Sequence, residues 1–141
     1  MIELEHTAHA AASRAAVWAV LADLESWHEW GPWTKTTLDG EIRTMTSERK
    51  RVTGKPYVMK ERVTALVEPE RFEYDLLSGL PVRNYHAVVT LSDGGDGDGG
   101  TDIHWRSSFD PPWPFFGGLW RGAMLKVIRD VSERLAKAAT G

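Results

Sequence analysis

A chain of 141 residues is about the size of one folded domain. Hydrophobic residues make up 42% and charged residues 26%, a composition that indicates a soluble globular protein and excludes a disordered tail. The net charge of -3 argues against nucleic acid as the main partner, because phosphate binding needs a basic field. No run approaches about 18 consecutive apolar residues, so the sequence predicts no membrane span.

Cysteine is absent, which excludes disulfides, thiolate nucleophiles and cysteine-based metal sites. The first residues lack the basic and apolar regions of a signal peptide, so we expect a cytoplasmic protein. No long linker or internal repeat divides the sequence, which predicts a single domain over 1–141. The sequence is compatible with a monomer and with a homodimer.

The N-terminal part of the chain predicts one strand and two short helices. Residues 2–10 alternate loosely, as a strand does, and Ser13 is a helix N-cap whose hydroxyl can accept from free backbone N–H groups. A second short helix over about 24–30 should end before Pro32, because the residue preceding a proline avoids the α region. This helix carries part of an aromatic cluster formed by Trp27, Trp30 and Trp33.

Residues 34–109 have a composition typical of strands separated by short turns. Turn residues at 39–40, 54–56, 68–70, 79–81 and 94–100 divide this region into six strands and predict an antiparallel meander. Alternation places aromatic side chains on one face of the last two strands, and this face must leave water. The inward residues are Tyr85, Ala87, Val89, Leu91, Ile103, Trp105, Ser107 and Phe109.

A long helix is predicted over about 115–138, after the proline-rich stretch 111–114. Its apolar residues recur at helical spacing, and they are Trp120, Ala123, Met124, Val127, Ile128, Val131 and Leu135. The element order is therefore strand, two short helices, six strands and one long helix. The simplest packing of this α+β order curls a seven-stranded antiparallel sheet around the long C-terminal helix.

Several short pieces of sequence, in this order and spacing, resemble a known family. They are Val17-Trp18, Leu21-Ala22-Asp23, Trp27 with Trp30, Glu61-Arg62-Val63-Thr64, Glu68-Pro69, Phe72-Glu73-Tyr74, Gly100-Thr101-Asp102-Ile103-His104-Trp105 and Phe109-Asp110-Pro111-Pro112. The chain resembles the polyketide cyclase/dehydrase-like branch of the START/Bet v 1-like (SRPBCC) superfamily, which has the helix-grip fold. The resemblance implies a hydrophobic cavity between the long helix and the sheet. Some members cyclise or dehydrate aromatic polyketides, whereas others bind lipids, hormones and other apolar molecules.

The inward aromatic residues are candidates for the wall of such a cavity, because ligand pockets are mainly apolar with a few orienting polar groups. The alternative is that each one fills the core. The candidate ligand-binding residues are Trp18, Trp30, Phe72, Tyr74, Tyr85, Ala87, Trp105, Ser107, Phe109, Phe116, Trp120 and Met124.

The catalytic candidates are Glu61, Tyr74, Tyr85 and His28. If Glu61 shares a face with Met59 and Val63, burial would raise the pKa of its carboxyl and suit it to acid–base chemistry. The alternatives are a salt bridge or a one-residue register slip that places Glu61 in water. Arg83 is either its partner, an anchor for an anionic ligand or a solvated edge residue.

The remaining motifs predict no metal and no cofactor. His86 and His104 lie on outward faces of predicted strands, where they would be cross-strand neighbours. The glycine-rich run 94–100 lacks the terminal Glu and flanking helices of an EF-hand and predicts a hairpin loop. The charged run 48–51 predicts a solvated strand face.

Three functions follow as hypotheses. The first is binding of a hydrophobic small molecule, polyketide-, lipid- or aromatic-like, in the internal cavity. The second is a cyclase or dehydratase that works by general acid–base chemistry in the same cavity. The third is a protein-interaction module that uses the same groove. The aromatic segment 111–118 would plug the cavity, gate it or contact another subunit.

Overall fold

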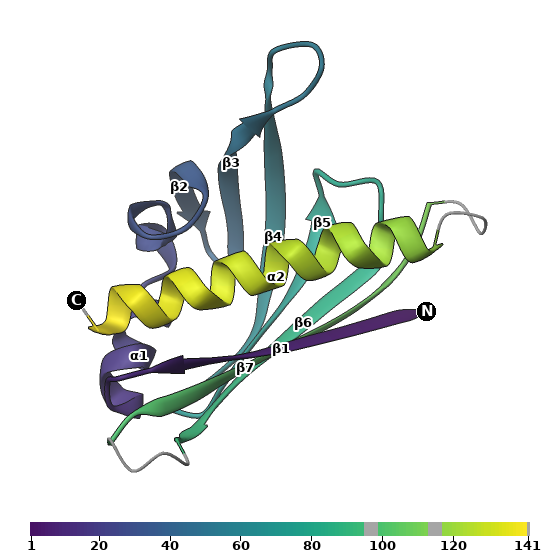
Figure 1. Ribbon diagram of the computed structural model, residues 1–141. Helices are drawn as coiled ribbons and strands as arrows, with labels where there is room; N and C mark the ends of the chain where they lie inside the picture. The colour runs from purple at the N-terminus through teal and green to yellow at the C-terminus, as the bar shows by residue number, and fades with distance from the viewer. Residues whose placement is uncertain (95–98, 113–116, 141) are drawn as a thin grey trace.

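The computed structural model describes residues 1–94, 99–112 and 117–140. A strand, two short helices, six strands and a long helix follow one another in the chain (Figure 1). Their bounds are β1 Ile2–Ala10, α1 Arg14–Leu21, the 3-10 helix η1 Leu24–Glu29, β2 Trp33–Asp39, β3 Ile42–Lys50, β4 Pro56–Val67, β5 Arg71–Ser78, β6 Arg83–Asp93, β7 Thr101–Asp110 and α2 Gly117–Thr140. The predicted α+β element order is confirmed.

The seven strands form one antiparallel sheet in the order β1-β7-β6-β5-β4-β3-β2. Strands β2 to β7 form the predicted meander, in which each strand pairs with the next. The first strand returns to the last one, so that Ala8 lies opposite Ile103 and Ala10 lies opposite Thr101. Figure 1 shows α2 running across one face of this sheet.

The two short helices are formed by local signals. Ser13 caps α1, because its hydroxyl accepts a hydrogen bond from the backbone N–H of Ala16 at 3.2 Å. Gly31 follows η1, where a Cβ atom would lie 2.2 Å from the ring of Trp33. Only glycine allows the chain to turn this close to the indole, so the aromatic cluster depends on this residue.

Helix α2 packs mainly against β1 and α1. The predicted range began at about residue 115, but residues 115 and 116 lie outside the described part of the chain. Met124, Ile128, Val131 and Leu135 are buried, as predicted. The prediction was wrong for Ala123 and Val127, which are exposed. The buried residues of α2 form a stripe as narrow as its contact with β1 and α1. Ala123 and Val127 each lie one residue before a buried residue, which turns them about 100° around the helix axis and away from this contact. No helix in the described ranges is long and apolar enough to cross a membrane.

Candidate functional site

The interior between the sheet and the helices is filled largely by aromatic rings. At its centre lies Trp27 of η1, which is 1% exposed and whose indole N–H donates to the carbonyl of Leu21 at 2.9 Å. Ring centroids within 6.4 Å of Trp27 belong to Trp30, Trp33, Phe72, Tyr74 and Trp105. Tyr85 joins this network through Tyr74, and Phe109 joins it through Tyr85.

The structure brings together most of the residues predicted to bind a ligand. Trp30 is partly buried within the ring network, and the residues fully buried on the inner side are Trp18, Phe72, Tyr74, Tyr85, Ala87, Trp105, Ser107, Phe109 and Met124. Trp120 is partly buried, and no aromatic contact joins it or Trp18 to the network among the described residues. Phe116 lies outside those residues.

A buried ion pair lies beside the aromatic rings. Arg43 Nη2 donates to Glu61 Oε1 at 2.6 Å, and the two side chains are 0% and 6% exposed. Arg43 and Glu61 lie opposite each other on β3 and β4, so both point to the inner face. The guanidinium carbon of Arg43 lies 3.7 Å from the ring centre of Trp27, a cation–π geometry that also favours burying the cation.

Glu61 is buried on the same face as Val63, as the alternation predicts, and it also forms a salt bridge, one of the alternatives left by the sequence. The register slip that would place Glu61 in water is wrong, although the register does shift between Lys60 and Glu61. Its partner is Arg43, whereas Arg83 is exposed beside Asp110. Sequence reasoning missed Arg43 because a single arginine in a strand normally faces water. The available signal was its alternation with Met45, which is also buried.

Burial changes the acid–base properties of three inward groups. Burial raises the pKa of the Glu61 carboxyl, and the charge and hydrogen bond of Arg43 oppose this rise. Burial also raises the pKa of Tyr74 well above its usual value, with further contributions from Tyr85 and Glu61. For Tyr85 burial raises the pKa to about 12, although the neighbouring hydroxyls of Ser107 and Tyr74 partly offset it. Both phenols are therefore neutral donors at physiological pH.

Some buried polar atoms in this interior have no hydrogen-bond partner among the described residues. They are the indole nitrogens of Trp30 and Trp105, Nε of Arg43 and the hydroxyl oxygen of Ser107. The first three are N–H donors, and all three side chains contact Trp27. Because buried polar groups in native proteins are nearly always paired, this group of donors is suited to acceptor oxygens of a bound molecule.

His28 lies apart from the other catalytic candidates. It is exposed on η1, and its Nδ1 lies 3.1 Å from the hydroxyl of Thr36 on β2. The described contacts connect it to neither Glu61 nor the two tyrosines. The structure therefore places Glu61, Tyr74 and Tyr85 together on the inner face, and His28 elsewhere.

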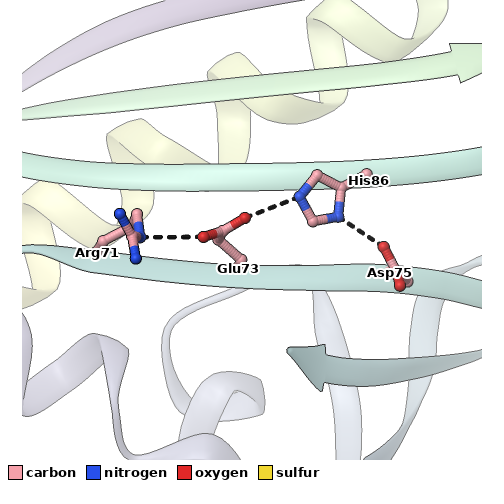
Figure 2. Close-up of polar contacts among 4 residues, drawn as sticks. All are labelled: Arg71, Glu73, Asp75 and His86. Carbon is pink, nitrogen blue, oxygen red and sulfur yellow. Dashed lines mark hydrogen bonds and ion pairs between the residues drawn. The ribbon is translucent and has the colours of Figure 1, made fainter. Parts of the chain in front are cut away.

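His86 and His104 lie on the outward face, but the prediction that they are neighbours was wrong. His86 lies opposite Ser108, and His104 lies opposite Thr90, because the long hairpin shifts them along the strands. His86 instead bridges two carboxylates of β5, as Figure 2 shows: its Nδ1 lies 2.6 Å from Asp75 and its Nε2 3.0 Å from Glu73. No group of three potential metal ligands occurs in the described ranges.

Two open depressions lie on the surface, away from the aromatic interior. One lies between the end of β1 and the last turns of α2, where Ala11 and Thr140 line it. The other lies at the end of the β3–β4 hairpin, where Tyr57 and Leu80 line it. Neither depression includes the candidate ligand-binding residues.

Comparison with protein families gives one match over almost the whole chain. The family described as "Polyketide cyclase / dehydrase and lipid transport" matches residues 1–140. The chain belongs to this family. This confirms the resemblance read from the sequence. A comparison with curated protein sequences gave no significant match.

Solved structures confirm the fold. The protein XoxI from Bacillus cereus superposes with a TM-score of 0.83 at 18% identity, over 98% of this chain and 95% of that chain. A protein from Thermobifida fusca gives a TM-score of 0.77 at 22% identity, over 99% of this chain and 93% of that one. A START superfamily protein from Mycobacterium smegmatis gives 0.76 at 15% identity, over 98% and 99% of the two chains. These likenesses establish the START-like, helix-grip architecture.

Proposed function

We propose that the protein binds a hydrophobic small molecule between α2 and the inner face of the sheet, and that buried donors hold an oxygen-bearing group of this molecule. The observation that carries the proposal is the group of buried N–H donors on Trp30, Arg43 and Trp105 that have no hydrogen-bond partner among the described residues. Leaving a buried donor unpaired costs about 1–3 kcal/mol, so a ligand that supplies acceptors gains from each one. The family's description is consistent with an apolar ligand.

The proposed route into the interior lies beside the N-terminal half of α2. Leu119 is 71% exposed and Val127 is 37% exposed, whereas the C-terminal half buries Val131 and Leu135 almost completely. Residues 117–123 include no buried side chain, so the first turns of α2 are held by little packing, whereas Met124 and Ile128 anchor the next turns. A small outward movement of these first turns would admit a ligand beside Trp120 and Met124, without disturbing the contact between α2 and α1.

Binding of cis-parinaric acid, a fluorescent fatty acid, tests the proposal. We expect saturable binding at micromolar concentration and a higher melting temperature, because a ligand that binds only the native state stabilises it. Trp105→Phe keeps an aromatic ring, although a smaller one, and removes the donor, so it should weaken binding by roughly 2- to 10-fold, the usual value of one hydrogen bond. Trp33→Phe is the matched control, since Trp33 packs against the same Trp27 ring and its indole nitrogen is not among the buried atoms that lack a partner in the described residues. Equal affinity of the two variants for the fatty acid would show that the donors do not bind it.

A second proposal is that the same interior catalyses cyclisation or dehydration of a polyketide-like substrate. It is favoured by the placement of Glu61, Tyr74 and Tyr85 on the inner side of the neighbouring strands β4, β5 and β6, with the rings of the two tyrosines 6.2 Å apart. In this reaction the Glu61 carboxylate takes a proton from the activated carbon, and a neutral tyrosine hydroxyl donates a hydrogen bond to the enolate oxygen.

Conservative variants distinguish the two proposals. Glu61→Gln removes the base and Tyr85→Phe removes the hydrogen-bond donor, each with little change of shape, so turnover of an aromatic polyketide precursor should fall by at least ~100-fold while binding changes little. Unchanged turnover in both variants would exclude these groups from the chemistry. Weaker binding with unchanged turnover at saturation would make them orienting groups of a carrier protein.

A further inference from the structure

The tip of the β3–β4 hairpin, residues 49–55, is a basic projection on an acidic protein. Arg49, Lys50, Arg51 and Lys55 fall within seven residues, although the whole chain has a net charge of -3. All seven residues are exposed, and none of the four basic side chains forms an ion pair with another described residue. Figure 1 shows the hairpin extending beyond the rest of the sheet.

The tip has a defined turn. The backbone N–H of Arg51 donates to the carbonyl of Lys55 at 2.8 Å, and that of Gly54 donates to the carbonyl of Arg51 at 2.9 Å. Gly54 has a φ of +86°, which glycine adopts without strain. These bonds fix the backbone. The basic side chains therefore project from one ordered loop, and their charge is concentrated in a small volume.

An apolar and an aromatic side chain accompany the charges. Val52 stands at the apex of the loop with its side chain fully exposed, the most exposed of the large hydrophobic residues that the structure describes. Behind it the guanidinium carbon of Arg51 lies 5.3 Å from the ring centre of Tyr57. Tyr57 also lines the open depression, together with Leu80 and Pro81. Nothing in the described fold requires an apolar residue at this apex.

We propose that the hairpin tip docks on an anionic lipid surface. The basic side chains would meet the headgroup phosphates, Val52 would enter the boundary with the acyl chains, and the amphipathic ring of Tyr57 would lie at headgroup level. The surface is thus complementary to a bilayer in charge and in polarity. A nucleic acid fits less well, because an exposed valine at the apex adds nothing to a phosphate contact.

Sedimentation with lipid vesicles tests this proposal. The protein should bind vesicles of phosphatidylcholine mixed with phosphatidylglycerol, bind vesicles of phosphatidylcholine alone far more weakly, and be released by high salt. Each basic side chain near an anionic surface contributes roughly fivefold in partitioning, so the triple variant Arg49→Gln/Lys50→Gln/Lys55→Gln should bind about 100-fold more weakly.

The matched control changes net charge equally on another element. Arg121→Gln/Lys126→Gln/Arg129→Gln replaces three exposed basic residues of α2 and should lose far less vesicle binding than the hairpin variant. Equal loss in the two variants, or equal binding to neutral and anionic vesicles, would overturn the proposal. Binding to duplex DNA with no binding to vesicles would assign the tip to nucleic acid and overturn it also.

A fluorescent probe tests insertion at the apex. The chain has no cysteine, so Val52→Cys provides a single site for an environment-sensitive fluorophore. Anionic vesicles should shift its emission to the blue, whereas the same label at the exposed Glu25 on η1 should show no shift. An unshifted label at position 52 would contradict insertion. Fatty-acid binding in the absence of vesicles does not involve the tip, so the two proposals fail independently.

Discussion

The sheet carries ion pairs on both faces, and water reaches the two sets differently. On the inner face Arg43 and Glu61 meet at 2.6 Å with side chains 0% and 6% exposed. On the outer face His86 and Asp75 meet at the same distance with side chains 37% and 40% exposed. Pairs with equal distances thus differ in their contribution to stability, because desolvation and screening depend on burial and not on the distance between the charges.

Removing one partner of the inner pair should lower the free energy of unfolding strongly, whereas replacing both partners with apolar residues should lower it little. Removal of one partner leaves the other charge buried, whereas the outer carboxylates and His86 can turn to water if a partner is lost. The same contrast extends to the neutral groups around them. Tyr74 and Tyr85 share the dry inner face with Glu61, so their ionisation is coupled to folding. Four predictions test this contrast.

The largest effect is expected at the buried pair. Arg43→Met should lower the free energy of unfolding by about 3–5 kcal/mol, because it leaves the Glu61 carboxylate without its partner. The double variant Arg43→Met/Glu61→Leu should recover much of this loss, since it removes both charges. Urea unfolding of the single and double variants measures these effects. A double variant less stable than Arg43→Met would contradict this recovery.

The second effect is alkaline loss of stability. The folded-state pKa of Tyr85 is raised to about 12, whereas its unfolded value is near 10. The folded chain therefore holds the phenolic proton more tightly, so this stability is complete below pH 10 and is lost as the pH rises from 10 to 12. The loss for one such group is about 2–3 kcal/mol at 1.36 kcal/mol per pKa unit.

Unfolding at pH 9 and pH 11 with Tyr85→Phe measures this effect. The variant cannot ionise at this position, so it should lose less stability between the two pH values than the unaltered protein. Identical losses would show that the phenol is reached by water in the folded state.

The third effect is smaller and occurs on the outer face. Burial lowers the pKa of His86, but hydrogen bonds and charges of Asp75 and Glu73 outweigh this and raise it overall. Stability from the charged imidazole is complete below its unfolded pKa, near 6.5, and is lost as the pH rises through the folded value. His86→Gln should therefore cost more at pH 6 than at pH 8.5, by less than about 1 kcal/mol because the site is solvated.

The carboxylates provide the control for this experiment. In the background Glu73→Gln/Asp75→Asn, His86→Gln should cost the same at both pH values. A pH dependence that survives there would assign the effect to another group. The nearby charges on the same face are Arg71, which contacts Glu73, and Arg62, which lies opposite Asp75.

The smallest effect is the response to salt. At about 1 M salt the screening length is near 3 Å, so the coupling between Arg71 and Glu73 should fall to nearly nothing, a change of a few tenths of a kcal/mol. The coupling between Arg43 and Glu61 should be almost unchanged. Double-mutant cycles at low and high salt compare the two. A salt-sensitive inner pair would contradict its burial.

The fold was predictable because its signals are local. Turn residues separate every pair of successive strands from β2 to β7, Ser13 caps α1, and alternation in β6 and β7 identifies the inner face correctly. The helix face was only partly predictable. Ala123 and Val127 fit the apolar period of α2, but the period cannot show how narrow the contact with β1 and α1 is.

The polar part of the interior was the least predictable. Tyr74 and Tyr85 follow from alternation, whereas Arg43 does not, because its burial depends on three elements distant in sequence: Glu61 on β4, Trp27 on η1 and Phe72 on β5. The prediction that His86 and His104 are cross-strand neighbours was wrong for a related reason. Cross-strand neighbours depend on where the turn lies, and the glycine-rich run gives no exact position for it.

The pairing of β1 with β7 has a consequence for how the protein is made. During synthesis the apolar side of β1 stays uncovered until its partner strand, residues 101–110, has been made. Helix α2 can pack on β1 only after that. The meander from β2 to β6 pairs locally in the meantime. Of the seven strands, β1 is thus among the last to be covered, and its charged residues Glu3 and Glu5 limit self-association in the meantime.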